Sequence, residues 1–310
     1  MQRISSSQPF PPALRGAVIA LGNFDGFHLG HQAVVARAVA MAKSMGVPAI
    51  VATFDPHPVR HFRPDAPPFR LTTLDQRQRL FGDAGADAML VLDFGAELAS
   101  LHADAFIADM LMAQFGARAV VTGTDFVFGA GRSGNGDTLR AAALDHGFTY
   151  EQVAPIEDGG VPVSSSRIRD ALRAGDCATA TRLLTRPFAI AGVVEHGAKD
   201  GRKLGFPTAN IDMGSYLRPA YGVYAVTGRL ADGRVLGGAA NLGIRPQFLP
   251  PREWLEPYFF DFSGDLYGQV IEVALHAYLR GEARFDSIDA LREQIARDCA
   301  LARETLSGLP

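Results

Sequence analysis

The chain has 310 residues, which is enough for two domains that each bury a hydrophobic core. Hydrophobic residues make up 47% of it and charged residues 20%, a composition typical of globular proteins that excludes a disordered or fibrous chain. The net charge of −3 disfavours nucleic acid as the main partner, and only two distant cysteines, Cys177 and Cys299, predict reduced thiols in a cytoplasmic protein. The N-terminus lacks a signal-peptide pattern and no apolar window approaches a membrane span, so no membrane association is expected.

Between about residues 16 and 183, apolar runs alternate with helical patterns, as in a doubly wound parallel sheet. Strands are predicted at 17–21, 49–54, 88–92 and 119–122, and helices at 32–44, 74–84, 103–114 and 138–146. Pro187 marks a break in this pattern. We therefore predict an α/β domain with a parallel sheet over residues 1–186.

The pattern after Pro187 is one of closely spaced β-like runs separated by Gly, Asp and Pro turns. These runs are at 188–195, 222–230, 235–241, 255–262 and 269–279. They predict a small antiparallel β-barrel over residues 187–310. A closing helix is expected at 287–306, capped by Ser287 and packing one apolar face on the barrel.

The segment from Ala17 to His31 combines a predicted strand, a glycine-containing turn and two histidines at the start of a helix. Backbone N–H groups and the dipole at a helix start favour an anion, and Gly30 lets a phosphate approach the backbone closely. If the helix begins between His28 and His31, both rings can face one transferring phosphoryl group. Metal ligation by the histidines, or a plain capped helix, are the alternatives.

Two other predicted strand ends carry candidate ligand contacts. Segment 53–58 contains two prolines that hold Phe54 and His57, so a flat aromatic ligand could stack there, or the loop could serve packing only. In segment 122–129, Asp125 could accept hydrogen bonds from a ring N–H or a sugar hydroxyl. Its two phenylalanines offer aromatic faces, although at least one is expected to pack in the core.

Three serines and two arginines cluster at another predicted helix start, within 163–172. Ser164 fits as the cap. Arg169 lies four residues after Ser165 and three after Ser166, so it can share their face and bind the same phosphate. Because the helix dipole disfavours arginines in a first turn, phosphate binding is the better explanation. A nucleoside triphosphate attacked at its α-phosphorus would be stabilised by Arg169 and the two histidines.

The second domain carries a basic, glycine-rich segment at 197–210. It ends in Thr208 and Asn210, whose oxygens are of the hard type that Mg²⁺ prefers. Lys203 could neutralise phosphates, or it could be a solvated loop residue. Glu256 lies on an otherwise aromatic and apolar strand and suits a general base, although an exposed strand carboxylate is the alternative.

Eight motifs follow one another along nearly the whole chain. They are Gly22-Asn-Phe-Asp-Gly-Phe-His-Leu-Gly-His31, Asp55-Pro-His-Pro58, Gly123-x-Asp-Phe-x-Phe-Gly129, Ser164-Ser-Ser-Arg-Ile-Arg169, Gly205-Phe-Pro-Thr-Ala-Asn210, Gly222-Val-Tyr224, Gly243-Ile-Arg-Pro246 and Asp265-Leu-Tyr-Gly268. With them, the chain resembles the bacterial bifunctional riboflavin kinase/FAD synthetase family. The first four look like the adenylyltransferase half and the last four like the kinase half. The resemblance implies a Rossmann-like nucleotidylyltransferase domain followed by a small antiparallel barrel with a terminal helix.

The resemblance also implies two reactions. The C-terminal domain would phosphorylate the ribityl hydroxyl of riboflavin from Mg-ATP, giving FMN. The N-terminal domain would then transfer AMP from a second ATP to FMN, giving FAD and pyrophosphate. In the kinase half, Thr208 and Asn210 would hold Mg-ATP, and Glu256 would remove the hydroxyl proton.

The adenylyltransferase residues that the resemblance implies form two groups. Those for the ATP phosphates are His28, His31, Ser165 and Arg169, with Gly22, Asn23, Gly30, Ser164 and Ser166 as further ATP-binding residues. Those for the flavin pocket are Phe54, Pro56, His57, Pro58, Asp125 and Phe128. Lys203 is added as an ATP-binding residue of the kinase half.

Two positions near the implied base differ from the family's usual residues. Gln247 stands where the family usually has Thr, and Tyr258 stands where it usually has His. A barrel that binds flavin but phosphorylates it poorly, and a flavin-binding regulatory protein, therefore remain alternatives to the bifunctional enzyme.

Overall fold

The computed structural model describes residues 1–196, 205–245 and 252–308. The chain forms two compact units. The first consists of Met1–Pro67 and Thr73–Ser164, and the second of Pro68–Thr72 and Ser165–Pro310. The short segment Pro68–Thr72 therefore belongs with the later part of the chain, where Arg70 forms an isolated bridge with Tyr216.

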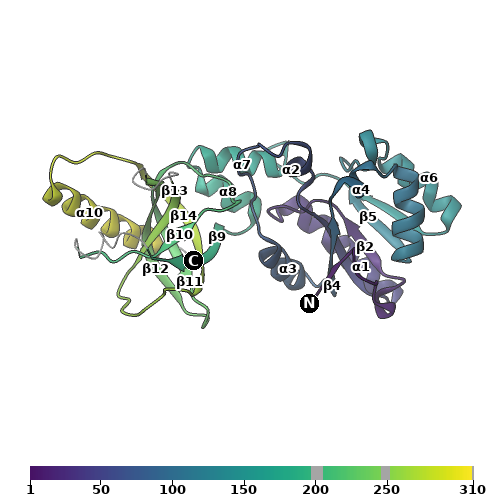
Figure 1. The fold of residues 1–310 in the computed structure, drawn as a ribbon, viewed down its shortest axis with the longest axis horizontal. Helices are drawn as coiled ribbons and strands as arrows, with labels where there is room; N and C mark the ends of the chain where they lie inside the picture. Colours follow the sequence, from purple (N-terminus) through teal and green to yellow (C-terminus); the bar gives the residue numbers. More distant parts are fainter. Residues whose placement is uncertain (197–204, 246–251, 309–310) are drawn as a thin grey trace. The chain divides into compact units, whose positions relative to one another are not determined.

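The first unit contains a six-stranded parallel sheet (Figure 1). Its strands are β1 (Gln2–Ser5), β2 (Val18–Leu21), β3 (Ala49–Asp55), β4 (Ala88–Asp93), β5 (Ala119–Gly123) and β6 (Thr149–Val153), in the order β1-β4-β3-β2-β5-β6. Its helices are α1 (Leu29–Met45), α2 (Pro58–Phe62), α3 (Leu74–Asp83), α4 (Ala96–Ser100), α5 (Ala103–Ala105) and α6 (Gly136–His146). A π-helix over Phe106–Gln114 continues α5, 3-10 turns lie at Pro12–Leu14 and Ala130–Arg132, and a small hairpin joins β7 (Glu157–Asp158) to β8 (Val161–Pro162).

The four strands and four helices predicted for this unit are confirmed. The two outer strands of the sheet, β1 and β6, were not predicted. Each pairs with one neighbour only, and their sequences are mostly polar, with Ile4 as the one buried residue of β1. Edge strands need no continuous apolar run, and for that reason they leave a weak sequence signal.

Helices cover both faces of this sheet. On β2, Val18 and Ala20 point into a cluster formed with the buried sides of α1 and α3. Ile19 and Leu21 point the opposite way, into a cluster formed with the π-helix and α6. Burial on both faces is what makes such a strand read as an unbroken apolar run, and each fully buried aliphatic side chain contributes roughly 1.5–3 kcal/mol.

The second unit contains a closed barrel of six antiparallel strands (Figure 1). The strands are β9 (Phe188–Glu195), β10 (Asn210–Asp212), β11 (Gly222–Arg229), β12 (Val235–Arg245), β13 (Arg252–Phe259) and β14 (Val270–Gly281), closed in the order β10-β13-β12-β11-β14-β9. Helices α7 (Ser165–Arg173) and α8 (Cys177–Leu184) precede the barrel, and α10 (Ile288–Ser307) follows it. The five predicted strands are confirmed, and the three-residue β10 is an addition.

The closing helix packs as predicted. The side chain of Ser287 accepts a hydrogen bond from the N–H of Ala290 at 3.1 Å and so caps α10. Ala302 of α10 then packs with Ala225 and Ala239 on the outer surface of the barrel. These contacts bury one face of α10, as its apolar periodicity predicts.

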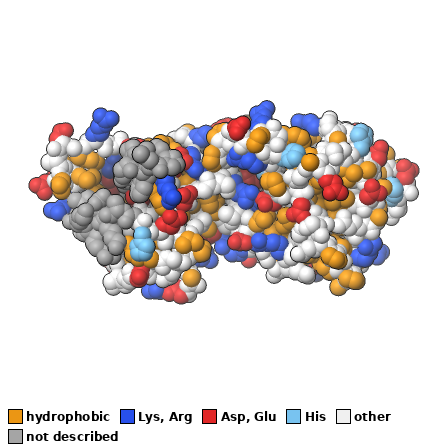
Figure 2. Space-filling model, in the orientation of Figure 1, with side chains coloured by type: hydrophobic (Ala, Val, Ile, Leu, Met, Phe, Trp, Pro, Cys, Tyr) orange, Lys and Arg blue, Asp and Glu red, His pale blue; other side chains and the backbone are white. Residues whose placement is uncertain are grey.

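The helices α7 and α8 group with the barrel by their contacts. The predicted boundary after residue 186 follows a change in sequence pattern, which is a different criterion, and it stays a prediction. On the face of the molecule shown in Figure 2, Lys and Arg side chains are interspersed with Asp and Glu. This mixture agrees with a net charge of only −3.

Candidate active sites

The two histidines of the first unit lie together at the start of α1. The helix begins at Leu29, between them, and His28 is its N-cap, with its Nδ1 accepting from the N–H of His31 at 3.4 Å. The rings of His28 and His31 stack with their centroids 3.6 Å apart and an angle of 21° between their planes. The helix start falls where the phosphate hypothesis requires it, so both imidazoles lie beside the N–H groups of the first turn.

The loop that leads to these histidines has an unusual backbone. Phe24, Gly26 and Phe27 have φ values of 49°, 86° and 45°, in the left-handed region. Two bulky non-glycine residues in that region carry strain, so the surrounding structure must hold the loop. The side-chain amide of Gln32 donates to the carbonyl of Phe27 at 2.9 Å, and the ring edge of Phe24 contacts that of His31 with centroids 5.2 Å apart.

Gly30 has a role that was not foreseen. A Cβ atom at this position would lie 3.2 Å from Cε1 and 3.3 Å from Nδ1 of His28. Its hydrogen side chain therefore leaves room for the His28 ring, and the close approach of an anion at Gly30 stays a prediction.

The loop after β3 presents part of the predicted flavin pocket. The Asp55–Pro56 peptide bond is cis, and the Nδ1 atom of His57 accepts from the N–H of Val59 at 3.2 Å, capping α2. Phe54 is only 7% exposed and belongs to the core. Its ring edge meets Phe94 with centroids 5.7 Å apart, so any flavin contact would use the part of the ring that the core leaves accessible.

The loop after β5 contains one exposed and one buried candidate. Asp125 is exposed, whereas Phe128 is 8% exposed and packs against Phe106 with ring centroids 5.5 Å apart. Phe126 stacks on Phe128 at 5.6 Å. Hydrogen bonds in both directions between Phe128 and Gly134 close this loop. The expectation that at least one of these phenylalanines packs in the core is confirmed.

The serine and arginine cluster lies at the start of α7, in the second unit apart from Ser164. The guanidinium Nε of Arg169 donates to the carbonyl of Phe69 at 2.8 Å, and its Cζ lies 5.4 Å from the centre of the Phe69 ring. These contacts fix the direction of the Arg169 side chain. The binding of one phosphate by Arg169, Ser165 and the two histidines stays a prediction.

The candidate base of the barrel lies on the outer surface that α10 also covers. Tyr258 packs in the cluster under α10, and Glu256 is two residues earlier on β13, so both point to the same side. The alternation of apolar and polar residues along β13 could not decide on which side of the strand Glu256 lies. Asn241 stands directly opposite Glu256 on β12, and its Nδ2 lies 3.5 Å from the carboxylate Oε2.

The segment with the predicted Mg-ATP residues runs beside this strand. The N–H of Ala209 donates to the carbonyl of Pro257 at 2.9 Å, and the Phe206 ring edge meets Tyr258 with centroids 5.4 Å apart. These contacts hold Thr208 and Asn210 next to the part of β13 that carries Glu256. The sequence predictions thus converge on one place in the barrel.

Tyr258, expected from the sequence to stand where the family usually has His, is an aromatic packing residue. Asn241 was missed from the sequence. The signal that could have identified it is a polar amide within the small and apolar run of β12. Lys203 and Gln247 lie outside the described residues.

Comparisons with known proteins define the class. Residues 10–167 match the FAD synthetase family and residues 184–306 match the riboflavin kinase family, so the chain combines an FAD synthetase half with a riboflavin kinase half. It is 41% identical to the bifunctional riboflavin kinase/FMN adenylyltransferase of Pseudomonas fluorescens, over 98% of this chain and 97% of that protein. It is 40% identical to the protein of that name from Escherichia coli K12, over 93% of this chain and 92% of its relative. The chain belongs to the bifunctional riboflavin kinase/FMN adenylyltransferase family.

A solved structure supports the fold. The crystal structure described as the macrolide-efflux protein from Streptococcus pneumoniae matches with a TM-score of 0.87 and 30% identity, covering 98% of this chain and 99% of that one. Within residues 1–196, 205–245 and 252–308, no helix is long and apolar enough to cross a membrane. In the same ranges, no group of three or more His, Cys, Asp and Glu side chains is placed to hold a metal ion.

Proposed function

We propose that this chain makes both flavin cofactors, phosphorylating riboflavin to FMN in the barrel and adenylylating FMN to FAD in the parallel-sheet unit. Family membership supports the pair of activities. The observation that carries the proposal is the presence of two separate constellations. Stacked histidines stand at a helix start in one unit, and a carboxylate beside the Thr208–Asn210 segment stands in the other.

In adenylyl transfer, an oxygen of the FMN phosphate attacks the α-phosphorus of ATP, and the bond to the β-phosphate bridging oxygen breaks to release pyrophosphate. The role of His28 and His31 is to donate to the phosphate oxygens as negative charge builds up, together with N–H groups of the first turn of α1. Further ATP-binding residues of this unit in the proposal are Gly22, Asn23, Gly30 and Ser164, and the ATP-binding roles of Ser165, Ser166 and Arg169 are assigned on sequence grounds alone. No covalent enzyme intermediate is needed, because positioning and charge stabilisation supply the catalysis.

The flavin pocket of this half is assigned to the loops after β3 and β5. Because Phe54 and Phe128 are largely buried, their role is to form the apolar floor of the pocket. Exposed Asp125 then supplies the polar contact to the flavin. Pro56, His57 and Pro58 complete the lining.

In the kinase half, Glu256 takes the proton from the ribityl hydroxyl as that oxygen attacks the γ-phosphorus of ATP, and the bond from the γ-phosphorus to the β–γ bridging oxygen breaks to release ADP. Asn241 orients the carboxylate through its amide. Thr208 and Asn210 offer a hydroxyl and an amide oxygen, donors that fit Mg²⁺ when most of its ligands are water and substrate phosphate. When bound, Mg²⁺ neutralises charge on the transferring phosphoryl group. Lys203 is assigned to the ATP phosphates on sequence grounds alone.

The proposed partners are thus ATP and flavins, and the proposed location is the cytoplasm. Burial raises the pKa of the Cys177 and Cys299 thiols to about 11 each. Such thiols are largely un-ionised and unreactive at neutral pH.

The test is to incubate the protein with riboflavin and Mg-ATP and to separate the flavins by chromatography. Both FMN and FAD should accumulate. His31→Ala should abolish FAD formation and leave FMN formation intact, because the histidine belongs to one unit only. His146→Ala, at an exposed histidine of α6, is the matched control and should leave both activities unchanged. Absence of both products from the wild-type protein would overturn the proposal, and FAD formed only from supplied FMN would favour the synthetase-only alternative.

A further inference from the structure

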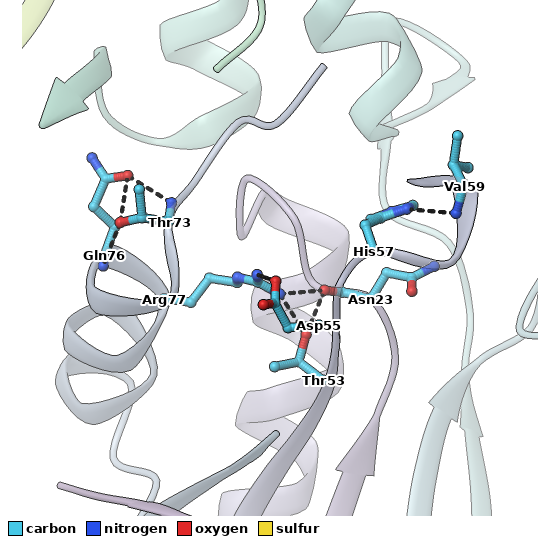
Figure 3. A network of polar contacts seen from close by, with 8 residues as sticks. All are labelled: Asn23, Thr53, Asp55, His57, Val59, Thr73, Gln76 and Arg77. Carbon is cyan, nitrogen blue, oxygen red and sulfur yellow. Dashed lines mark hydrogen bonds and ion pairs between the residues drawn. The ribbon is translucent and has the colours of Figure 1, made fainter. Parts of the chain in front are cut away.

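A buried arginine lies behind the loops of the adenylyltransferase half. Arg77, on α3, is only 2% exposed. Its Nη1 donates to the Thr53 hydroxyl at 2.7 Å and to the carbonyl of Asn23 at 3.3 Å, and its Nη2 lies 3.7 Å from Oδ1 of Asp55 (Figure 3). The Thr53 hydroxyl itself donates to the Asn23 carbonyl at 2.7 Å. One guanidinium thus touches three backbone or side-chain groups from two segments.

These two segments carry the residues assigned to different substrates. Asn23 lies in the strained loop that leads to His28 and His31. Asp55 ends β3 and directly precedes the loop of Pro56 and His57. Arg77 therefore connects the ATP loop, defined as 22–31, with the flavin loop, defined as 55–58.

The rest of α3 is built to hold this arginine in place. Thr73 and Gln76 form a capping box at its start, with bonds of 3.2 Å from the Gln76 N–H to the Thr73 hydroxyl and 2.9 Å from the Thr73 N–H to the side-chain Oε1 of Gln76 (Figure 3). Phe81, one turn after Arg77, contacts Phe24 and Phe27 with ring centroids 5.9 and 5.0 Å apart. These are the two non-glycine residues of the loop with positive φ, so one face of α3 supports the strained backbone with both an aromatic ring and a guanidinium.

Burying a guanidinium is costly unless its hydrogen bonds are well placed, and an apolar side chain of similar length could fill the same space. What an apolar residue could not do is donate to the Asn23 carbonyl and the Thr53 hydroxyl from one nitrogen while a second nitrogen lies near the Asp55 carboxylate. An arginine at this position is therefore explained by its holding of the two segments in a fixed geometry, and not by packing alone.

We propose that Arg77 is a positioning residue for adenylyl transfer, which sets the ATP loop relative to the flavin loop. The inference rests on the proposed function of this unit. It does not make Arg77 a catalytic residue, because it acts through Asn23, Thr53 and Asp55.

The test compares Arg77→Met and Arg77→Lys in steady-state FAD formation from FMN and ATP. A misplacement of about 1 Å between reacting groups can cost about 100-fold in rate, so kcat/KM for FMN should fall by about 10- to 100-fold in Arg77→Met, with kcat falling as well. Arg77→Lys keeps the charge and one donor nitrogen and should recover part of the loss. Riboflavin kinase activity in the same samples should stay at the wild-type value, which shows that the barrel is intact.

The matched control is Arg3→Met. Arg3 also bonds to α3, through Asp75 and Gln78 on the outside of the helix, but it touches neither loop. Removing it should leave the kinetics of FAD formation unchanged. If Arg3→Met and Arg77→Met both lower kcat/KM for FAD formation, any disturbance of α3 is enough to cause the loss, and the positioning role is overturned.

Unchanged kcat and KM in Arg77→Met would equally overturn it, even with a lower melting temperature. If Arg77→Met does not fold, Thr53→Val decides the question, because it removes only the bridging hydroxyl. A fall in kcat/KM of about threefold or more supports the role, and wild-type kinetics refute it. The proposed function fails separately, when wild-type protein makes no FAD from FMN.

Discussion

Replacing Glu256 by Gln isolates the proton transfer proposed for the kinase half. The two side chains have nearly the same size, and the register of β12 against β13 is set by a backbone ladder that the change does not touch. The carbonyl oxygen of the new amide could still accept from the Asn241 side chain, whose Nδ2 lies 3.5 Å from the native carboxylate. Riboflavin and ATP should therefore bind as before, with KM values within about twofold of wild type.

The expected loss lies in kcat. A positioned general base contributes roughly 10²- to 10⁴-fold, or about 3–5 kcal/mol at 1.36 kcal/mol per tenfold. Phosphoryl transfer depends mainly on positioning and charge stabilisation, which Thr208 and Asn210 keep, so the lower end applies. We expect kcat for FMN formation to fall by about 100-fold.

The assay is steady-state FMN formation from riboflavin, with FAD formation from FMN measured in the same preparation as the internal reference. Glu253→Gln is the matched control. Glu253 lies three residues earlier on β13, so it points to the opposite side, where its Oε2 pairs with Nε of Arg218 at 2.6 Å. That variant should retain kinase kcat within about twofold. A Glu256→Gln enzyme with wild-type melting temperature and less than a threefold loss of kcat would refute the reasoning.

Two further predictions concern stability. Asp298→Asn should lower the free energy of unfolding of the barrel by about 3 kcal/mol. The buried carboxylate of Asp298 accepts hydrogen bonds of 2.6 to 3.1 Å from Arg280, and the substitution leaves the Arg280 guanidinium without a counter-charge. Urea unfolding followed by fluorescence of Trp254, the single Trp of the chain, measures this in the barrel, and an unchanged midpoint would contradict it. Burial lowers the pKa of His276 from its ordinary value of 6.5. As the pH falls past that value, the unfolded chain therefore binds more protons than the folded chain, and the stability of the wild-type protein should fall between pH 7.5 and 5.5. His276→Gln does not titrate and should lose less on acidification. An equal drop in melting temperature for both proteins would argue against this origin.

The sequence was most informative where a strand is buried on both faces. The runs of β2, β3, β4 and β5 are continuous because helices cover both sides of them, and their positions were predicted to within two residues. β13 was harder. Trp254, Leu255, Tyr258 and Phe259 are apolar on both sides of that strand, so alternation could not place Glu256, and only the packing of Tyr258 under α10 does so.

Arg77 illustrates a different limit. It lies in Asp75-Gln-Arg-Gln-Arg79, a run that looks like the solvent-facing side of a helix. Its burial depends on the Asn23 carbonyl and the Thr53 hydroxyl, which are distant in sequence and meet only once the sheet has formed. A long-range polar contact of this kind has no period and no local motif by which the sequence could have indicated it.

The segment Pro68–Thr72 has a consequence for how the two activities can be separated. The N–H of Arg70 donates to the carbonyl of Ser215 at 3.1 Å, and its carbonyl accepts from the N–H of Leu217 at 2.8 Å. The chain thus contributes five residues to the barrel unit before it returns to finish the sheet unit. No single cut of the polypeptide yields both units whole, and a gene fragment encoding the barrel from residue 165 onward leaves these two backbone bonds of its Ser215–Leu217 turn unmade. Exchange of one whole unit between such proteins by recombination therefore requires three compatible joints, after residues 67, 72 and 164, and not one.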